Sequence, residues 1–216
     1  MNTATLSRTT APKAALLVPA LLACYLVWGS TYLAIRLALA SFPPFFQMGT
    51  RFLVAGILLM GWVLWRRAAS PRTAAPLPTG REWRNALIVG TLMLGGGMGL
   101  TATASQYVGS GLIATFIAVT PMLVCGWGLL FGQRPRGLEL AGMVVGLAGV
   151  VMLAQGASFS AAPVGIACIA GATLMWSLGS VLQTTRLPLA AGATGFATEM
   201  LCGGAVLMLL SLAMDE

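Results

Sequence analysis

Histidine is absent from the 216 residues. This excludes Ser-His nucleophilic pairs, histidine general acid–base catalysis and most histidine-based metal sites. The turn at Gly109-Ser110-Gly111 offers a serine without a base, the chain has a single aspartate, and no P-loop motif for phosphate binding occurs. The sequence therefore predicts a protein that is not an enzyme, has no cofactor and has no metal site.

Charge is also scarce. Charged residues make up only 8% of the chain, hydrophobic residues make up 58%, and the mean hydropathy is +0.89. This leaves too little polar surface to cover a water-soluble globule. The net charge of +7 comes from basic residues in short gaps between apolar runs, which disfavours a nucleic-acid partner. The predicted fold class is an all-α polytopic membrane protein.

The cysteines do not suggest a disulfide framework. The four cysteines all lie inside apolar stretches without close pairing: Cys24, Cys125, Cys168 and Cys202. This distribution predicts buried packing and favours neither disulfides nor a metal site.

Seven apolar runs reach the length of about 20 residues that crosses a bilayer. They cover roughly 15–40, 44–65, 85–106, 111–131, 137–155, 162–183 and 193–213. The gaps between them are rich in proline, glycine and serine, which break helices. The chain is thus expected to form about seven transmembrane helices.

Lysine and arginine fall in alternate connections, which sets the orientation. The basic residues of these connections are Arg8 and Lys13; Arg66, Arg67, Arg72, Arg81 and Arg84; Arg134 and Arg136; and Arg186. By the positive-inside rule, residues 1–14 form a cytoplasmic N-terminus and the chain ends outside.

A cleaved signal peptide is the alternative for the N-terminus. Leu21-Leu22-Ala23-Cys24 loosely resembles a lipid-attachment site behind a basic segment. However, the apolar run continues to about Ala40, whereas the apolar region of a signal peptide is roughly 7 to 15 residues long. A retained first span is therefore favoured.

Part of the chain repeats at a constant offset of 148. Between residues 26 and 64 the offset gives nine identities, at positions 26, 28, 39, 50, 53, 56, 59, 60 and 64. Five spans separate the starts of the two copies, so the second copy is inverted relative to the first. Inverted repeats are the architecture of many secondary transporters.

Ionisable side chains inside the spans are the first candidates for a site, because a charge at mid-bilayer costs roughly 2.5 to 3.5 kcal/mol. These are Arg36, Arg51 and Glu199; Glu139 begins a span, where the helix dipole explains it better. Arg36 has an equally good interpretation as a residue that reaches the headgroups. Arg51 and Glu199 occupy equivalent places in the inverted copies, so we expect both to line one cavity and to serve substrate binding and coupling.

Five further residues complete the predicted site. The deep aromatic residues Trp28, Tyr32 and Trp176 are expected to form a cavity wall. Gln106 ends the third run, which is the most polar one and is expected to line a cavity. Hydroxyl groups that bond to their own helix backbone explain this polarity equally well. Pro121 interrupts the fourth run and predicts a kink in a moving helix. A proline without a functional role is the alternative, because proline is common in membrane helices.

Several motifs resemble the EamA-type family of the drug/metabolite transporter superfamily. The motifs are Val27-Trp28-Gly29-Ser30-Thr31-Tyr32 with Ala34-Ile35-Arg36, Gly49-Thr50-Arg51-Phe52, Thr120-Pro121, and Phe131-Gly132-Gln133-Arg134-Pro135 leading into Gly142 and Gly146-Leu147-Ala148-Gly149-Val150. The resemblance implies ten helices in two inverted five-helix repeats, a central cavity, and export of small metabolites, amino acids or drugs across the plasma (inner) membrane. At the position of Gln133 the family commonly has glutamate.

The expected organisation follows from this resemblance. Residues 15–155 form a first repeat of five helices, and residues 162–216 form the first two helices of a second repeat. Two functions remain open: a secondary-active exporter that works by alternating access, or a truncated, non-transporting membrane fragment or scaffold. The unpaired small-residue faces predict a homo-oligomer or a complementing chain besides a small-molecule substrate and the lipid bilayer.

Overall fold

A computed structural model describes residues 14–70, 76–156 and 162–216. The predictions that concern Arg8, Lys13 and Arg72 fall outside these residues. All regular elements in the described residues are helical: α1 (Ala14–Ala38), α2 (Pro44–Ala69), α3 (Gly80–Gly90), η1 (Thr91–Met98), α4 (Gly99–Ala104), α5 (Ser110–Ile117), α6 (Thr120–Leu130), α7 (Gly137–Gly156), α8 (Pro163–Thr185) and α9 (Ala193–Ala213). The predicted class, an all-α polytopic membrane protein, is confirmed.

Within the residues that the structure describes, six segments are long and apolar enough to cross a membrane. They are Leu17–Ala38, Pro44–Ala69, Gly80–Ala104, Ser110–Leu130, Pro163–Thr185 and Ala193–Ala213. The third of these is one span built from α3, η1 and α4, and the fourth is built from α5 and α6. The helix α7 contributes a shorter apolar stretch, Gly137–Met152.

The third span begins at Gly80, earlier than the predicted residue 85, because a capping box fixes its start. The Thr79 hydroxyl accepts a hydrogen bond from the Glu82 backbone N–H at 3.3 Å, and the Glu82 carboxylate accepts one from the Thr79 N–H at 2.7 Å. Together these bonds satisfy two backbone donors that a helix start leaves free.

A π-helix, η1, occupies the middle of the third span. Two of its three adjacent glycines lie against α8: a Cβ on Gly96 would collide with Met175, and one on Gly97 would lie 2.8 Å from Trp176 Cε3. Small residues allow such close approach of helices in a membrane protein. The glycines thus make η1 the packing centre of the third span.

The contacts between helices fix their relative directions. The third span runs antiparallel to α8, since Met93 contacts the Gly179 position and Leu100 the Gly171 position. It runs parallel to α9, because the Gly90 position contacts Gly203 and the Gly99 position contacts Leu207. These directions agree with the alternation of seven spans.

The pair α5–α6 runs parallel to α8. Ile113 and Ile169 lie in one apolar cluster, and farther along the Trp127 indole N–H donates to the Ser177 hydroxyl at 3.0 Å. Two parallel helices require the chain to cross back between them. The 20 residues of α7, about 30 Å at the usual rise per residue, provide that crossing.

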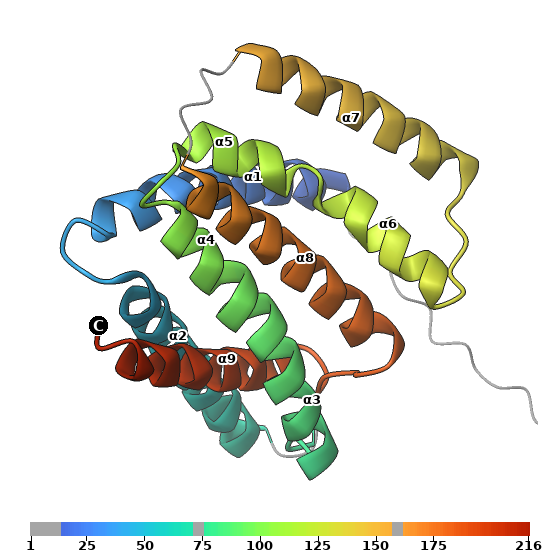
Figure 1. Ribbon diagram of the computed structural model, residues 1–216. Helices are drawn as coiled ribbons and strands as arrows, with labels where there is room; N and C mark the ends of the chain where they lie inside the picture. Colours follow the sequence, from blue (N-terminus) through green and yellow to red (C-terminus); the bar gives the residue numbers. More distant parts are fainter. Residues whose placement is uncertain (1–13, 71–75, 157–161) are drawn as a thin grey trace, which may run out of the picture.

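Figure 1 shows the resulting arrangement. The connections α6–α7 and α8–α9 lie towards the right of the view, whereas α1–α2 and α4–α5 lie towards the left. The third span and α8 lie at the centre, α2 crosses α9 below them, and α7 lies at the periphery. The connections α6–α7 and α8–α9 carry the basic residues Arg134, Arg136 and Arg186.

Candidate functional site in the helix bundle

The helices α2 and α9 pack antiparallel through glycines. A Cβ on Gly56 would lie 3.0 Å from Leu201 Cγ, and one on Gly204 would lie 3.0 Å from Leu53 Cγ. Gly56 and Gly204 are equivalent under the 148 offset, and so are Leu53 and Leu201. The same contact is therefore made twice with the two helices exchanged, as across a two-fold axis.

Two of the predicted wall residues meet directly. The rings of Trp28 on α1 and Trp176 on α8 contact edge to face, with centroids 6.5 Å apart. The Trp28 indole N–H donates to the Tyr32 hydroxyl at 3.1 Å. Tyr32 and Trp176 also pack against the apolar cluster around Met48 and Leu94. The structure thus brings Trp28, Tyr32 and Trp176 together.

Glu199 is the buried carboxyl group of the bundle. Its residue is 6% exposed, and its backbone oxygen would lie 2.8 Å from a Cβ on Gly90, so α9 and α3 touch at this level. Within the described part of the chain, the Glu199 side chain makes no hydrogen bond or ion pair. An unpaired carboxyl in such a place is costly, which makes it a candidate for function rather than for stability.

Arg51 lies on the opposite flank of the α2–α9 pair. It is two positions from both Gly49 and Leu53, which face α9, so at about 3.6 residues per turn it projects away from α9. Its residue is exposed, and its guanidinium lies 5.5 Å from the ring centroid of Phe52. Glu199, two positions before Leu201, projects away from α2 by the same geometry. The described structure therefore keeps Arg51 and Glu199 apart.

Arg36 is also exposed, near the end of α1. The preceding residue, the buried Ile35, joins the cluster with Phe45 and Met48, and its carbonyl accepts a hydrogen bond from Gln47 Nε2 at 3.3 Å. Arg36 thus lies on the outer side of α1, beside a tightly packed residue.

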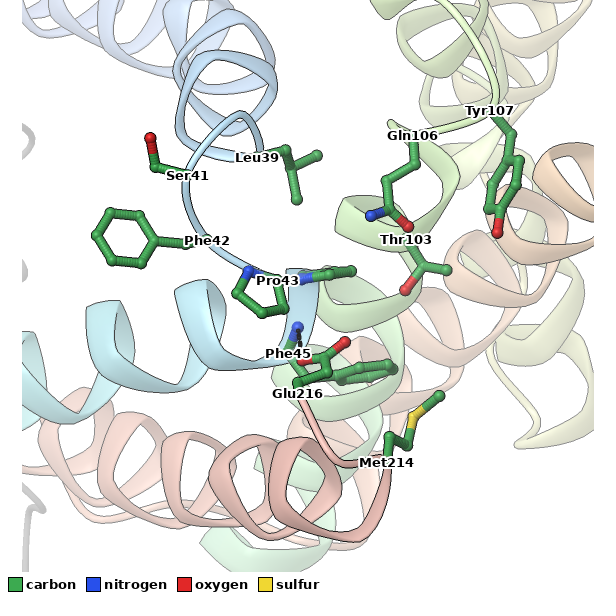
Figure 2. A pocket seen from close by; sticks show the side chains of 11 residues that line it. Leu39, Ser41, Phe42, Pro43, Phe45, Thr103, Gln106, Tyr107, Met214 and Glu216 are labelled. Carbon is green, nitrogen blue, oxygen red and sulfur yellow. Dashed lines mark hydrogen bonds between the residues drawn. The ribbon is translucent and has the colours of Figure 1, made fainter.

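Gln106 lines a cavity at one end of the bundle (Figure 2). The cavity has a volume of about 490 Å³ and is formed where α1, α2, α4 and α9 end or begin. Gln106 and Thr103 project towards the loop at Pro43, and Tyr107 also lines the cavity, whereas the Ser41 hydroxyl group points away from these residues. None of the other predicted site residues lines this cavity.

The wall of this cavity includes the N-terminus of α2. Oε2 of Glu216 accepts hydrogen bonds from the backbone N–H groups of Phe45 and Phe46, at 3.0 and 3.1 Å. These donors have no partner within the helix, and a carboxylate there is also favoured by the helix dipole. Sequence reasoning missed this contact; Pro43-Pro44, typical of a helix start, was the available signal.

Pro121 lies just after a break in the fourth span. The helix α5 ends at Ile117 and α6 begins at Thr120. The Met122 N–H donates to the Val119 carbonyl at 3.0 Å, as expected where a proline removes a regular helical bond. Pro121 itself is exposed, and a second cavity of about 320 Å³ separates it from α7.

The comparisons with known proteins agree with this geometry. The model of the EamA-like transporter family matches residues 13–155. The chain belongs to this family. It is 39% identical over 198 residues to an uncharacterized inner membrane transporter of Escherichia coli, YedA, a match that covers 91% of the chain and 62% of YedA.

More distant relatives have similar names. An uncharacterized transporter of Archaeoglobus fulgidus is 33% identical over 59% of the chain and 42% of its own length. The uncharacterized transporter YvbV of Bacillus subtilis is 29% identical over 75% of the chain and 52% of its own length. No solved structure matches the chain significantly. The chain thus spans less than two thirds of the length of these relatives.

Proposed function

We propose that the protein acts in secondary-active export of small metabolites, amino acids or drugs across the inner membrane, with its N-terminus in the cytoplasm. The observation that carries the proposal is the reciprocal contact of Gly56 with Leu201 and of Gly204 with Leu53. It joins two antiparallel helices at positions that the inverted repeat makes equivalent. Two related halves that exchange roles are what alternating access requires.

The predicted residues receive distinct roles. Trp28, Tyr32 and Trp176 form an aromatic wall for an amphipathic substrate, and Glu199 exchanges a proton or cation as the coupling group. Arg51 and Arg36 attract anionic groups of the substrate. Gln106 binds substrate at the outer end, and Pro121 permits the fourth span to bend.

The uncovered side of α2 indicates that another helix packs there. Under the 148 offset, Arg51, Ala55 and Leu58 correspond to Glu199, Gly203 and Val206, the flank of α9 that the third span covers. On α2 this flank is uncovered: Leu58 is 69% exposed. The occupant we propose is a helix parallel to α2, as the third helix of a complete second repeat would be. A non-transporting fragment, the alternative function, is not favoured by family membership.

A vesicle assay of the full-length protein tests the proposal. Everted vesicles are screened for gradient-dependent accumulation of amphipathic metabolites, and the best substrate is then used to compare variants. We expect Arg51→Ala and Glu199→Gln to abolish the gradient-dependent rate while inserting normally. Glu82→Gln, which alters a capping carboxyl outside the proposed site, is the matched control. Wild-type rates in both site variants would refute the assigned roles.

A further inference from the structure

The cavity beside Pro121 is separate from the cavity around Gln106. It lies between the α5–α6 break and α7, and its volume is about 320 Å³. Its wall is formed by Ala118, Pro121, Met122, Glu139, Gly142, Met143 and Gly146. It shares no residue with the cavity of Figure 2.

Glycines keep this cavity open on the α7 side. A Cβ on Gly142 would meet nothing within 4 Å, and one on Gly146 would meet only Met122 Cε, at 3.9 Å. Apart from Glu139, the remaining wall is apolar and includes two methionines, whose flexible side chains adapt to ligands of different shape. The cavity is therefore a slot that can accept an alkyl chain.

The polar groups of the slot are all hydrogen-bond acceptors. Glu139 is its only charged residue, and one carboxylate oxygen already accepts from the Arg136 N–H at 2.9 Å. At the helix break, Pro121 has no N–H for the Ile117 carbonyl. The Met122 N–H donates to Val119 rather than to the Ala118 carbonyl, and Ala118 lies on the cavity wall. No side chain in the wall carries an N–H or O–H donor.

We propose that this slot binds soluble amphiphilic primary amines, with the ammonium group at Glu139 and the alkyl chain along Met122 and Met143. A primary ammonium supplies the hydrogen-bond donors and the positive charge that the wall lacks. A carboxylate ligand would be repelled by Glu139, and a quaternary ammonium has no N–H to donate to the Glu139 carboxylate. The site does not depend on the proposed transport function.

Calorimetric titration of the purified chain in phosphatidylcholine nanodiscs tests the site. The probe is n-octylammonium, compared with n-octyltrimethylammonium and n-octanoate. We expect saturable binding of the primary amine, weaker binding of the quaternary amine and none of the acid. Since a charge-assisted hydrogen bond contributes about 1.5 to 3 kcal/mol, Glu139→Gln should weaken octylammonium binding about tenfold or more.

Matched variants separate binding from folding. Gly146→Leu fills the slot and should abolish binding, whereas Ala148→Leu, two positions on and therefore on another side of α7, should leave it unchanged. Glu82→Gln controls for the capping role, because Glu82 and Glu139 both accept a backbone N–H at a helix start. It should bind octylammonium like the wild type.

Three results would overturn the proposal. The first is equal affinity of the wild type and Glu139→Gln for octylammonium, and the second is equal affinity of the wild type for octylammonium and octyltrimethylammonium. The third is loss of octylammonium binding when phosphatidylethanolamine replaces part of the phosphatidylcholine, which would assign the slot to a lipid headgroup instead of a soluble amine.

Discussion

Trp28 and Trp176 contact each other edge to face, at an interplanar angle of 66°. The two residues are 148 positions apart and are counterparts in the internal repeat. A residue that touches its own counterpart lies beside the axis that relates the two copies. The reciprocal contacts of Gly56 and Gly204 lie across a helix pair related in the same way. Packing at both places therefore joins positions that the repeat makes equivalent.

The tryptophan contact predicts a measurable coupling. Aromatic pairs contribute about 0.5 to 1.5 kcal/mol beyond the area that they bury. A double-mutant cycle of Trp28→Leu and Trp176→Leu, followed by thermal unfolding in detergent, should give a coupling energy in that range. The cycle of Trp62→Leu with Trp176→Leu is the control and should give none. Additive effects of the first pair would contradict the contact.

The α2–α9 contact predicts equal sensitivity at two glycines. Gly56→Val and Gly204→Val should each lower the free energy of unfolding by roughly 1 to 3 kcal/mol, because both would overpack a leucine on the facing helix. Gly61→Val lies on the same helix as Gly56 but in open space, and it should change stability little. Unfolding in increasing dodecyl sulfate measures all three, and a selective loss in Gly61→Val would refute this packing.

Glu199 is predicted to be unfavourable for stability. A buried polar group without a partner costs about 1 to 3 kcal/mol, so Glu199→Met should unfold at a higher temperature than the wild type. The same variant should lose gradient-driven transport if the proposed coupling role is correct. Destabilisation of the bundle by Glu199→Met would show that the carboxyl group has a structural partner.

The seven-span topology predicts which positions react from each side of the membrane. In a cysteine-free background, single cysteines at Ser41, Gly109 and Ala162 should react in intact cells with a membrane-impermeant maleimide. Cysteines at Gln133 and Leu187 should react only after permeabilisation. Labelling of Gln133 and Ala162 from the same side would show that α7 does not cross the membrane.

The spans could be predicted from sequence because the bilayer sets the length of an apolar run. The start of the third span could not be placed by hydropathy, since it depends on the hydrogen bonds between Thr79 and Glu82, although the Thr-x-x-Glu pattern was visible. The π-helix had no comparable signal beyond three adjacent glycines.

The site was predictable only in part. Trp28 and Trp176 meet because they lie beside the symmetry axis, which the offset could suggest. Arg51 and Glu199 share the offset but lie away from the contact stripe of their helices, so equivalence alone did not bring them together. The cavity around Gln106 forms where four helix ends converge, and this depends on tertiary packing that no local pattern encodes.

The π-helix also sets the rotational phase of the third span. Its wider turn takes up more residues for each revolution than an α-helix does, so residues beyond Met98 face other neighbours than they would in an uninterrupted helix. Gln106 reaches the cavity of Figure 2 from beyond this shift. The π-helix therefore sets which way the end of the third span faces. Lengthening or shortening the Gly95–Gly97 stretch by one residue would rotate that polar end without altering any side chain there.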